Sequence, residues 1–270
     1  MAWAEAEPAN VREAFVNADY NPRSYWDNVA TRIALRGQGN IVAGDDTPFT
    51  RYVRNAFVEE FGLIDFEGQR VLEVGPGPGG NLALVAGRHP TWLIGCDISE
   101  HMIELARKNL RDLHPAVELF HINGRNLPLQ KNTVDITYTV TVLQHVCNED
   151  MLADLLIEIC RVTTKRIILF EDTFYRRWEK YSHVGRSVAD YERLVSPSGF
   201  TLVEVKHLST AYSHIACSTI RRVTSPHYRH EAEPIPVWTA RLQRACLALT
   251  RPVDRLWPLH VGLTKMIFER

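Results

Sequence analysis

The chain has 270 residues, 45% of them hydrophobic, and is therefore long enough to bury a full core within one large domain. Its 31 lysines and arginines nearly balance its 32 aspartates and glutamates, which leaves a formal net charge of -1 at pH 7. This balance provides no overall positive field that would collect a nucleic-acid backbone, so the composition gives no support for a nucleic-acid partner.

The cysteines and the hydropathy pattern indicate a reducing compartment. Five cysteines are scattered along the chain without a C-x-x-C pair, which argues against a disulfide framework and against a zinc site. No apolar stretch is long enough to span a bilayer, and the first residues lack the apolar segment of a secretory signal. We therefore expect a soluble, cytoplasmic protein.

Two helices are expected first, followed by alternating strands and helices. The first helix has Ser24 as its candidate N-cap, and the second begins at Thr47 and Pro48 and ends at Gly62. Strand-length apolar runs follow at residues 70–74, 91–96, 117–122, 134–140 and 166–171, with helical segments at 81–88, 99–113 and 148–161. Strands that alternate with helices predict a parallel sheet with crossover connections.

The remaining elements are one helix, two strands and a long insertion between those strands. The helix is expected at residues 187–195, and the strands at 200–208 and 260–270. About fifty residues between the two strands are too many for a passive connection, so we expect them to cover the substrate site. Trp238, Leu242, Ala245 and Leu249 recur there at helical spacing among arginines. Such a helix most often covers the core, which is the expectation here; it can also close over an apolar substrate, and contact with a membrane is the less favoured alternative.

The clearest motif is the glycine-rich turn "RVLEVGPGPGGN" that follows the first predicted strand. It satisfies G-x-G-x-x-G through Gly75, Gly77 and Gly80, and also a tighter E-x-G-x-G-x-G pattern that begins at Glu73. Glycines allow close approach of the backbone to a ligand, either a pyrophosphate or the carboxylate of a methionine moiety. Asp97 follows the next strand, where an acid can accept hydrogen bonds from ribose hydroxyls of either cofactor.

Three linked motifs resemble those of class I S-adenosylmethionine-dependent methyltransferases. They are "VLEVGPGPGGN", "GCDISEHMIELARKN" and "NGRNLPLQKNTVDITYTVTVLQHV", in the order and at the spacing usual in that family. The resemblance implies a Rossmann-like α/β fold with a seven-stranded, mostly parallel sheet, an antiparallel last strand and helices on both faces. We divide the chain into an N-terminal helical lid (1–62), a cofactor-binding core (63–208), the insertion (209–258) and a closing strand (259–270).

The same resemblance implies S-adenosylmethionine as cofactor and predicts the residues around it. Glu73 and the glycine turn correspond to the methionine site, Asp97 to the ribose site, and Ile98 and Met102 to the adenine site. Asn123 stands where many members carry an aspartate, so an acceptor oxygen is kept but its charge is lost. The full predicted set is Glu73, Gly75, Gly77, Gly79, Asn81, Asp97, Ile98, Met102, Asn123, Gly124, Arg125, Thr139 and Tyr25.

Methyl transfer is an in-line displacement that depends on alignment, and it needs a base only where the nucleophile starts protonated. Substrates in this fold lie beyond the carboxyl ends of the parallel strands, where His145 and Glu171 are the candidate catalytic residues. His145 suits a general base, although it can instead orient its loop. Glu171 can bind a cationic group or cap the following segment.

Two further groups of side chains have alternative interpretations. Tyr20, Tyr25 and Trp26 resemble the aromatic lid of small-molecule methyltransferases, or else pack the core. His227 and His230 lie beside two glutamates in a pattern that resembles a metal cluster with unclear further ligands, and no metal is expected.

The sequence favours an enzyme that methylates an oxygen or nitrogen of a small or medium-sized, partly apolar metabolite. The tetrapeptide of amino-methylating DNA enzymes is absent after the fourth strand, where "TVTVLQ" stands, so a small-molecule acceptor is expected. The alternatives are a lipid-linked or glycan-linked acceptor at a membrane surface, and a catalytically silent cofactor-binding scaffold or sensor. A nicotinamide oxidoreductase is a distant fourth, and the oligomeric state stays open.

Overall fold

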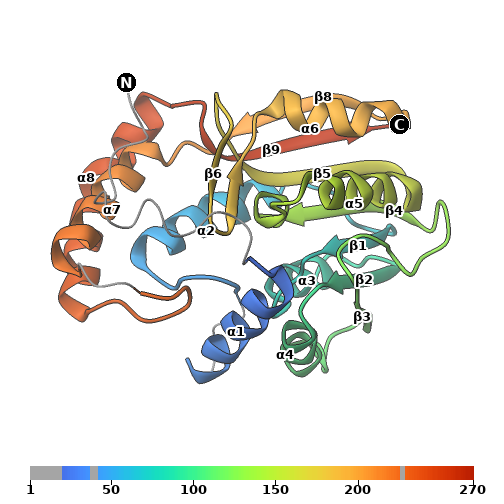
Figure 1. The fold of residues 1–270 in the computed structure, drawn as a ribbon, viewed down its shortest axis with the longest axis horizontal. Helices are drawn as coiled ribbons and strands as arrows, with labels where there is room; N and C mark the ends of the chain where they lie inside the picture. The colour runs from blue at the N-terminus through green and yellow to red at the C-terminus, as the bar shows by residue number, and fades with distance from the viewer. Residues whose placement is uncertain (1–19, 37–41, 226–228) are drawn as a thin grey trace.

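A computed structural model describes residues 20–36, 42–225 and 229–270 of the chain (Figure 1). Its centre is a seven-stranded sheet in the order β3-β2-β1-β4-β5-β9-β8. The strands are β1 (Arg70–Val74), β2 (Trp92–Asp97), β3 (Val117–His121), β4 (Val134–Val140), β5 (Thr163–Thr173), β8 (Thr201–His207) and β9 (Gly262–Glu269). Strands β1 to β5 pair in parallel, and β9 runs antiparallel to both β5 and β8, so the predicted mostly parallel sheet with an antiparallel last strand is confirmed.

Helices cover both faces of this sheet. The flanking helices are α2 (Pro48–Phe61), α3 (Gly80–Ala86), α4 (Glu100–Leu110), α5 (Glu149–Val162) and α6 (Val188–Val195). Buried side chains of α5 and α6 form one core with the sheet, and those of α2, α3 and α4 form a second core. The central strands are therefore buried on both sides, which explains why their sequences are continuous apolar runs.

Side-chain caps fix where most of these helices begin. Thr47 caps α2 in a reciprocal capping box with Thr50, as the Thr47-Pro48 start predicted. Ser99 caps α4, Asn148 caps α5 and Ser187 caps α6, each through a hydrogen bond to a backbone N–H of the first turn.

The cap of the first helix, α1 (Pro22–Leu35), differs from the prediction. Asn21 is the N-cap, and its side chain accepts a hydrogen bond from the backbone N–H of Ser24 at 3.1 Å. Ser24 was therefore the wrong cap. The reason is Pro22, whose fixed φ suits the first helical position and so places the cap one residue ahead of itself.

Three elements lie outside the predicted alternation. A short hairpin, β6 (Trp178–Lys180) with β7 (His183–Gly185), follows β5. The insertion forms two helices, α7 (Ala211–Thr224) and α8 (Val237–Leu256), which pack on each other and on α2. Figure 1 shows α7 and α8 at the edge of the molecule toward which the parallel strands point. None of the helices described has the length and apolar character needed to cross a bilayer.

Candidate active site

The glycine turn connects β1 to α3 in a conformation that ordinary side chains rarely adopt. Gly75, Gly77 and Gly79 have φ angles of +75°, +54° and +94°. A Cβ at Gly75 would lie 2.3 Å from the Cγ2 of Val142, and one at Gly79 would lie 2.7 Å from the Cδ1 of Leu110. Glycine is therefore required here by both backbone geometry and space.

Glu73, at the end of β1, is fully buried beneath this turn. Its Oε2 accepts a hydrogen bond from the Tyr138 hydroxyl at 2.9 Å, and its Oε1 accepts one from the Asn81 amide at 2.9 Å. The side-chain oxygen of Asn81 in turn accepts a hydrogen bond from Arg54. Burial raises the pKa of Glu73 to about 7, because a carboxylate in a low-dielectric environment is costly to ionise.

Asp97, at the end of β2, faces the glycine turn. Its Oδ2 accepts from the backbone N–H of Gly77 at 3.0 Å, and its Oδ1 accepts from the backbone N–H of Ser99 at 2.9 Å. Burial raises the pKa of Asp97 to about 6. A carboxylate offers about four acceptor positions, so each oxygen retains capacity for one more donor. That remaining capacity fits a pair of ribose hydroxyls.

The other predicted cofactor residues lie in the loops after β2 and β3, and their side chains have different surroundings. Ile98 and Gly124 lie together, since a Cβ at Gly124 would be 2.9 Å from the Cδ1 of Ile98. The Asn123 side-chain oxygen accepts from the backbone N–H groups of Arg125 and Asn126, both at 2.9 Å, so it closes its own loop. Arg125 forms an ion pair with Asp154 of α5 and so points to the surface.

Helix α1 lies directly on this end of the site. Met102 is 1% exposed and packs against Val29, Ala30 and Ile33 of α1. Asp27 of α1 accepts a hydrogen bond from the Ser99 hydroxyl at 2.6 Å, one residue from Ile98. Helix α1, to which we restrict the name lid from here on, therefore packs over Met102 and Ser99, beside the predicted ribose and adenine residues.

His145 lies at the end of the one-turn 3-10 helix η2 (Leu143–His145), directly after β4. Its Nδ1 is 2.7 Å from the carbonyl oxygen of Ser182 in the β6–β7 turn. A carbonyl can only accept, so Nδ1 carries the hydrogen and, in the neutral ring, Nε2 carries the lone pair. Desolvation lowers the pKa of His145 below its ordinary value, which keeps the ring neutral.

Two buried charged residues hold the loop that carries His145. Glu171 accepts from the Thr139 hydroxyl at 2.8 Å, from Val142 N–H at 3.1 Å and from Gln144 N–H at 3.3 Å. From the other side, Arg186 donates to the carbonyls of Leu143 and Val146 at 2.9 and 2.7 Å. The bonds of Glu171 and Thr139 are thus directed at this loop, which favours a positioning role for both over contact with ligands.

Aromatic rings surround His145, and we name them the aromatic wall. Trp26 of α1 meets the His145 ring edge-on at a centroid distance of 5.0 Å. The His183 ring lies 5.2 Å from His145 and stacks on Trp178. The Nε2 of His183 is buried and has no hydrogen-bond partner among the described residues. The members of the wall are Tyr20, Tyr25, Trp26, Trp178, Tyr181 and His183.

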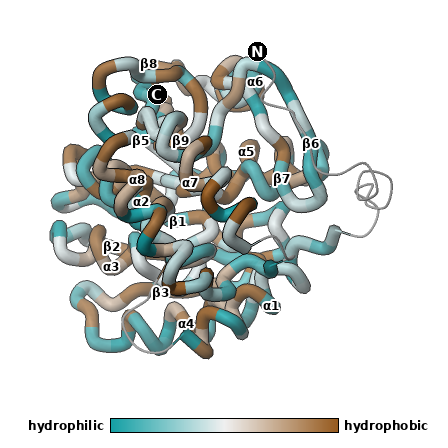
Figure 2. The backbone as a smooth tube through the Cα atoms, turned by 90° about the vertical axis from the view of Figure 1, so that its left-hand side faces the viewer, coloured by the Kyte–Doolittle hydropathy of each residue, from teal (hydrophilic) through white to brown (hydrophobic). Residues whose placement is uncertain are grey.

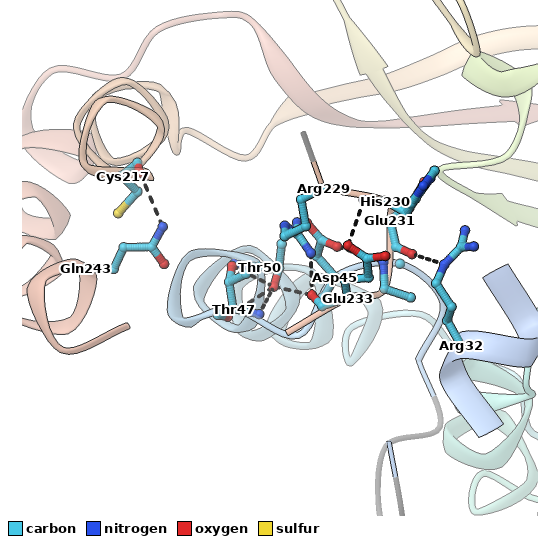
Figure 3. Close-up of polar contacts among 12 residues, drawn as sticks. Arg32, Asp45, Thr47, Thr50, Cys217, Arg229, His230, Glu231, Glu233 and Gln243 are labelled. Atoms are coloured by element: carbon cyan, nitrogen blue, oxygen red, sulfur yellow. Dashed lines mark hydrogen bonds and ion pairs between the residues drawn. The ribbon is translucent and has the colours of Figure 1, made fainter. Parts of the chain in front are cut away.

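Residues 229–233 of the insertion, which we name the strap, fasten the lid (Figure 3). The Tyr25 hydroxyl donates to Glu231 Oε2 at 2.6 Å, and Arg32 donates to the Glu231 carbonyl at 2.6 Å. Arg229 forms an ion pair with Asp45, which also accepts from the backbone N–H of Ala232 at 2.9 Å. The strap therefore joins the lid to the loop before α2.

The histidines of the strap region do not complete a metal site in the part of the chain that the structure describes. Glu231 binds Tyr25, and Glu233 accepts from the backbone N–H of His230 at 3.0 Å. No group of three or more histidine, cysteine, aspartate or glutamate side chains suited to a metal ion occurs among the described residues. His227 lies outside them.

Several residues that build this site were missed in the sequence. Ser182, Arg186 and Asp27 belong to no motif, and each acts through a contact with a segment distant in the chain. Arg186 alone lies next to a recognisable sequence feature, because Ser187 is the N-cap of α6. That feature predicts the start of a helix and does not indicate a functional site.

Comparison with known proteins gives consistent matches. Residues 71–166 match a family described as a methyltransferase domain. The ubiquinone biosynthesis O-methyltransferase of Agrobacterium fabrum is 26% identical over 164 residues, 54% of this chain and 63% of the relative. The crystal structure of the [4+2]-cyclase SpnF shares 14% identity at a TM-score of 0.63, covering 92% of this chain and 95% of its own. An S-adenosylmethionine-dependent methyltransferase from Mesorhizobium loti shares 15% identity at a TM-score of 0.51, covering 82% and 96%.

The sequence matches are partial in length. The aligned segments make up 63%, 24% and 38% of three curated relatives. The family match at residues 71–166 runs from β1 into β5 and includes the glycine turn, whereas the structural matches extend over most of the chain.

Proposed function

Because the chain belongs to the class I S-adenosylmethionine-dependent methyltransferases, we propose that it methylates a hydroxyl oxygen of a small or medium-sized, partly apolar molecule. The observation that carries this proposal is the neutral imidazole of His145. Its Nδ1 is fixed by the Ser182 carbonyl, and its Nε2 is left as the acceptor beside the lid.

The glycine turn and the two acids fit the cofactor. Gly75, Gly77 and Gly79 allow the left-handed backbone of the turn, and the two oxygens of Asp97 retain acceptor capacity for a diol. Glu73 is held by neutral donors and lies beneath the turn, so a cationic group that bound near the methionine end would favour its ionised form. When bound, S-adenosylmethionine supplies a methyl carbon already activated by its sulfonium.

His145 supplies the proton acceptor that a hydroxyl needs. A hydroxyl is a weak nucleophile until its proton is removed, and a positioned base contributes about 10²- to 10⁴-fold to such a step. Burial lowers the pKa of His145, which favours the neutral form of the ring that can accept a proton. Glu171 and Arg186 act as positioning residues, since they fix the loop from opposite sides.

The aromatic wall suits a flat or apolar acceptor with at least one polar group. Trp26 contacts His145 edge-on and Trp178 stacks on His183, and such large apolar rings pack well on an apolar acceptor. The unpartnered Nε2 of His183 marks a second position for a polar group of the acceptor, because buried polar atoms are almost always paired. An O-methyltransferase among the curated relatives is consistent with this choice of atom.

A panel of phenolic and aliphatic alcohols, scored by mass-spectrometric detection of methylated product and S-adenosylhomocysteine, tests the proposal. We expect turnover with at least one phenolic member, and a loss of about 10²- to 10⁴-fold in kcat in His145→Ala with cofactor affinity kept. His114→Gln, at an exposed histidine away from the site, is the matched control. Tight cofactor binding without turnover of any acceptor would instead support a silent scaffold, and unchanged kcat in His145→Ala would remove the base.

A further inference from the structure

Helix α8 exposes an apolar stripe that nothing in the described chain covers. Trp238, Leu242, Leu249 and Leu256 are 52%, 46%, 76% and 68% exposed, and Ala245 between them is also exposed. At 3.6 residues per turn these five side chains fall within an arc of about 60°. We name this set the α8 stripe. Figure 2 looks onto the side of the molecule that carries α7 and α8.

The face of α8 that packs against the rest of the protein is largely polar. The apolar α8 stripe is therefore not the face that packs into the core. The buried residues on that face are Thr239, Gln243, Leu247 and Asp254. Gln243 donates to the Cys217 carbonyl at 3.2 Å (Figure 3), and Asp254 accepts from the Ser213 hydroxyl at 2.5 Å. These contacts fix which face of α8 turns inward. The expectation that the apolar periodicity covers the core is therefore wrong for this helix.

The exposed surface of both insertion helices is basic. Six arginines are exposed on α7 and α8: Arg221, Arg222, Arg241, Arg244, Arg251 and Arg255. The only acid on either helix is Asp254, which is 1% exposed and bonded internally. On the helical wheel the four arginines of α8 all fall on one flank of the stripe. An apolar stripe thus runs beside a row of uncompensated positive charge.

A basic groove lies at this flank, between α2 and α8. It has a volume of about 290 Å³ and is lined by Pro48, Arg51, Arg244, Leu247, Ala248 and Arg251. Arg251 is also held above the Tyr52 ring, 4.8 Å from its centroid. Arg51 is already paired with Asp46, so Arg244 and Arg251 provide the planar guanidinium groups that suit the oxygens of a phosphate group.

We propose that the α8 stripe and its arginine flank dock on the surface of an anionic phospholipid bilayer, with lipid phosphates at the basic groove. Amphipathic helices with tryptophan and leucine on one face and arginine beside it bind this interface through combined apolar burial and charge attraction. A second copy of the chain is disfavoured, because α8 has no exposed acid that could face the arginines of the other copy, Asp254 being 1% exposed. Nucleic acid would match the charge but leave the stripe exposed to water.

Vesicle co-sedimentation of the full chain tests the proposal, and it requires neither cofactor nor acceptor, so its result is independent of methyl transfer. Vesicles of phosphatidylcholine alone are compared with vesicles containing phosphatidylserine. We expect binding to the anionic vesicles that weakens with salt. Trp238→Ser with Leu249→Ser is expected to weaken binding about tenfold. Arg241→Gln with Arg244→Gln is expected to weaken it about fivefold for each charge removed.

Variants on α5 and α6 serve as matched controls for vesicle binding. Ile157→Ser removes an apolar side chain of α5 that is 55% exposed, and Arg193→Gln removes an exposed arginine of α6. Both control variants are expected to bind vesicles as the wild type does. The proposal is overturned if the wild type does not sediment with anionic vesicles at low salt, or if the α8 variants bind unchanged. A dimer in solution that Leu249→Ser converts to a monomer, without vesicle binding, would assign the stripe to a second copy.

Discussion

The cofactor end of the site and the cover above it differ in how far apart in the chain their contacts lie. Glu73 and Asp97 accept from partners no more than 65 residues away, two of them within the same strand-turn-helix unit. In the cover, the side chains of Asp45 and Glu231 bind partners at least 184 residues away. Local contacts fix a rigid cofactor end, whereas the cover depends on the folded chain holding the strap against the lid.

Among the changes that compare these two regions, the largest expected effect is at the cofactor end. Asp97→Ala removes the oxygens that we assign to the ribose hydroxyls, and two hydrogen bonds to a charged acceptor account for a loss of about 100-fold in cofactor affinity. Calorimetric titration with S-adenosylhomocysteine measures it. Asp154→Ala, at an acid that pairs with Arg125 on the surface, serves as control. Equal losses in both variants would show that the site assignment is wrong.

A second prediction concerns the buried acid beneath the turn. Since the pKa of Glu73 is about 7 in the folded chain and about 4.3 in an unfolded one, the folded state holds a proton that the unfolded state has released. Wild-type stability therefore falls as pH rises through this window and levels off above it. Relative to wild type, Glu73→Gln is expected to gain about 2 kcal/mol between pH 5 and pH 8.

Urea unfolding of the two proteins at several pH values measures this difference. Glu67→Gln, at an exposed position just before β1, is expected to show no such trend. A difference between Glu73→Gln and wild type that is constant over the whole pH range would mean that Glu73 is ionised in the folded chain.

The smallest expected effect is in the cover. Asp45→Asn breaks the ion pair with Arg229 and loosens the strap, so release of bound S-adenosylhomocysteine should quicken about tenfold while Tm shifts by only a few degrees. Asp46→Asn is a close control, because the Asp46 carboxylate lies next in sequence but binds the exposed Arg51 and not the strap. Stopped-flow displacement measures the rate. If both variants release the ligand at the wild-type rate, the strap does not hold the lid.

The sequence predicted the fold where local signals decide the structure. The strands β1 to β5 and the caps at Thr47 and Ser99 follow from apolar periodicity and cap chemistry within a few residues. The β6–β7 hairpin was missed because strands of three residues carry no periodic signal. The orientation of α8 was also missed, because buried hydrogen bonds of Gln243 and Asp254 override its apolar pattern.

In the candidate site, too, residues set by local sequence signals were predicted and residues set by distant contacts were not. Glu73, Asp97 and the glycines are recognisable since their spacing in the sequence is set by one strand and one turn. Ser182 and Arg186 lie 37 to 43 residues from the groups they fix, and Glu231 lies 206 residues from Tyr25. Only the folded chain brings such residues together, so a single sequence carries no signal for them.

Calorimetric titration of the wild-type chain with S-adenosylmethionine, S-adenosylhomocysteine and NAD tests the central claim most directly. The account predicts micromolar binding of the first two and no binding of NAD, because the glycine turn, Glu73 and Asp97 form a site for the methyl donor. Binding of NAD, or failure of both sulfur-containing ligands to bind, would contradict it.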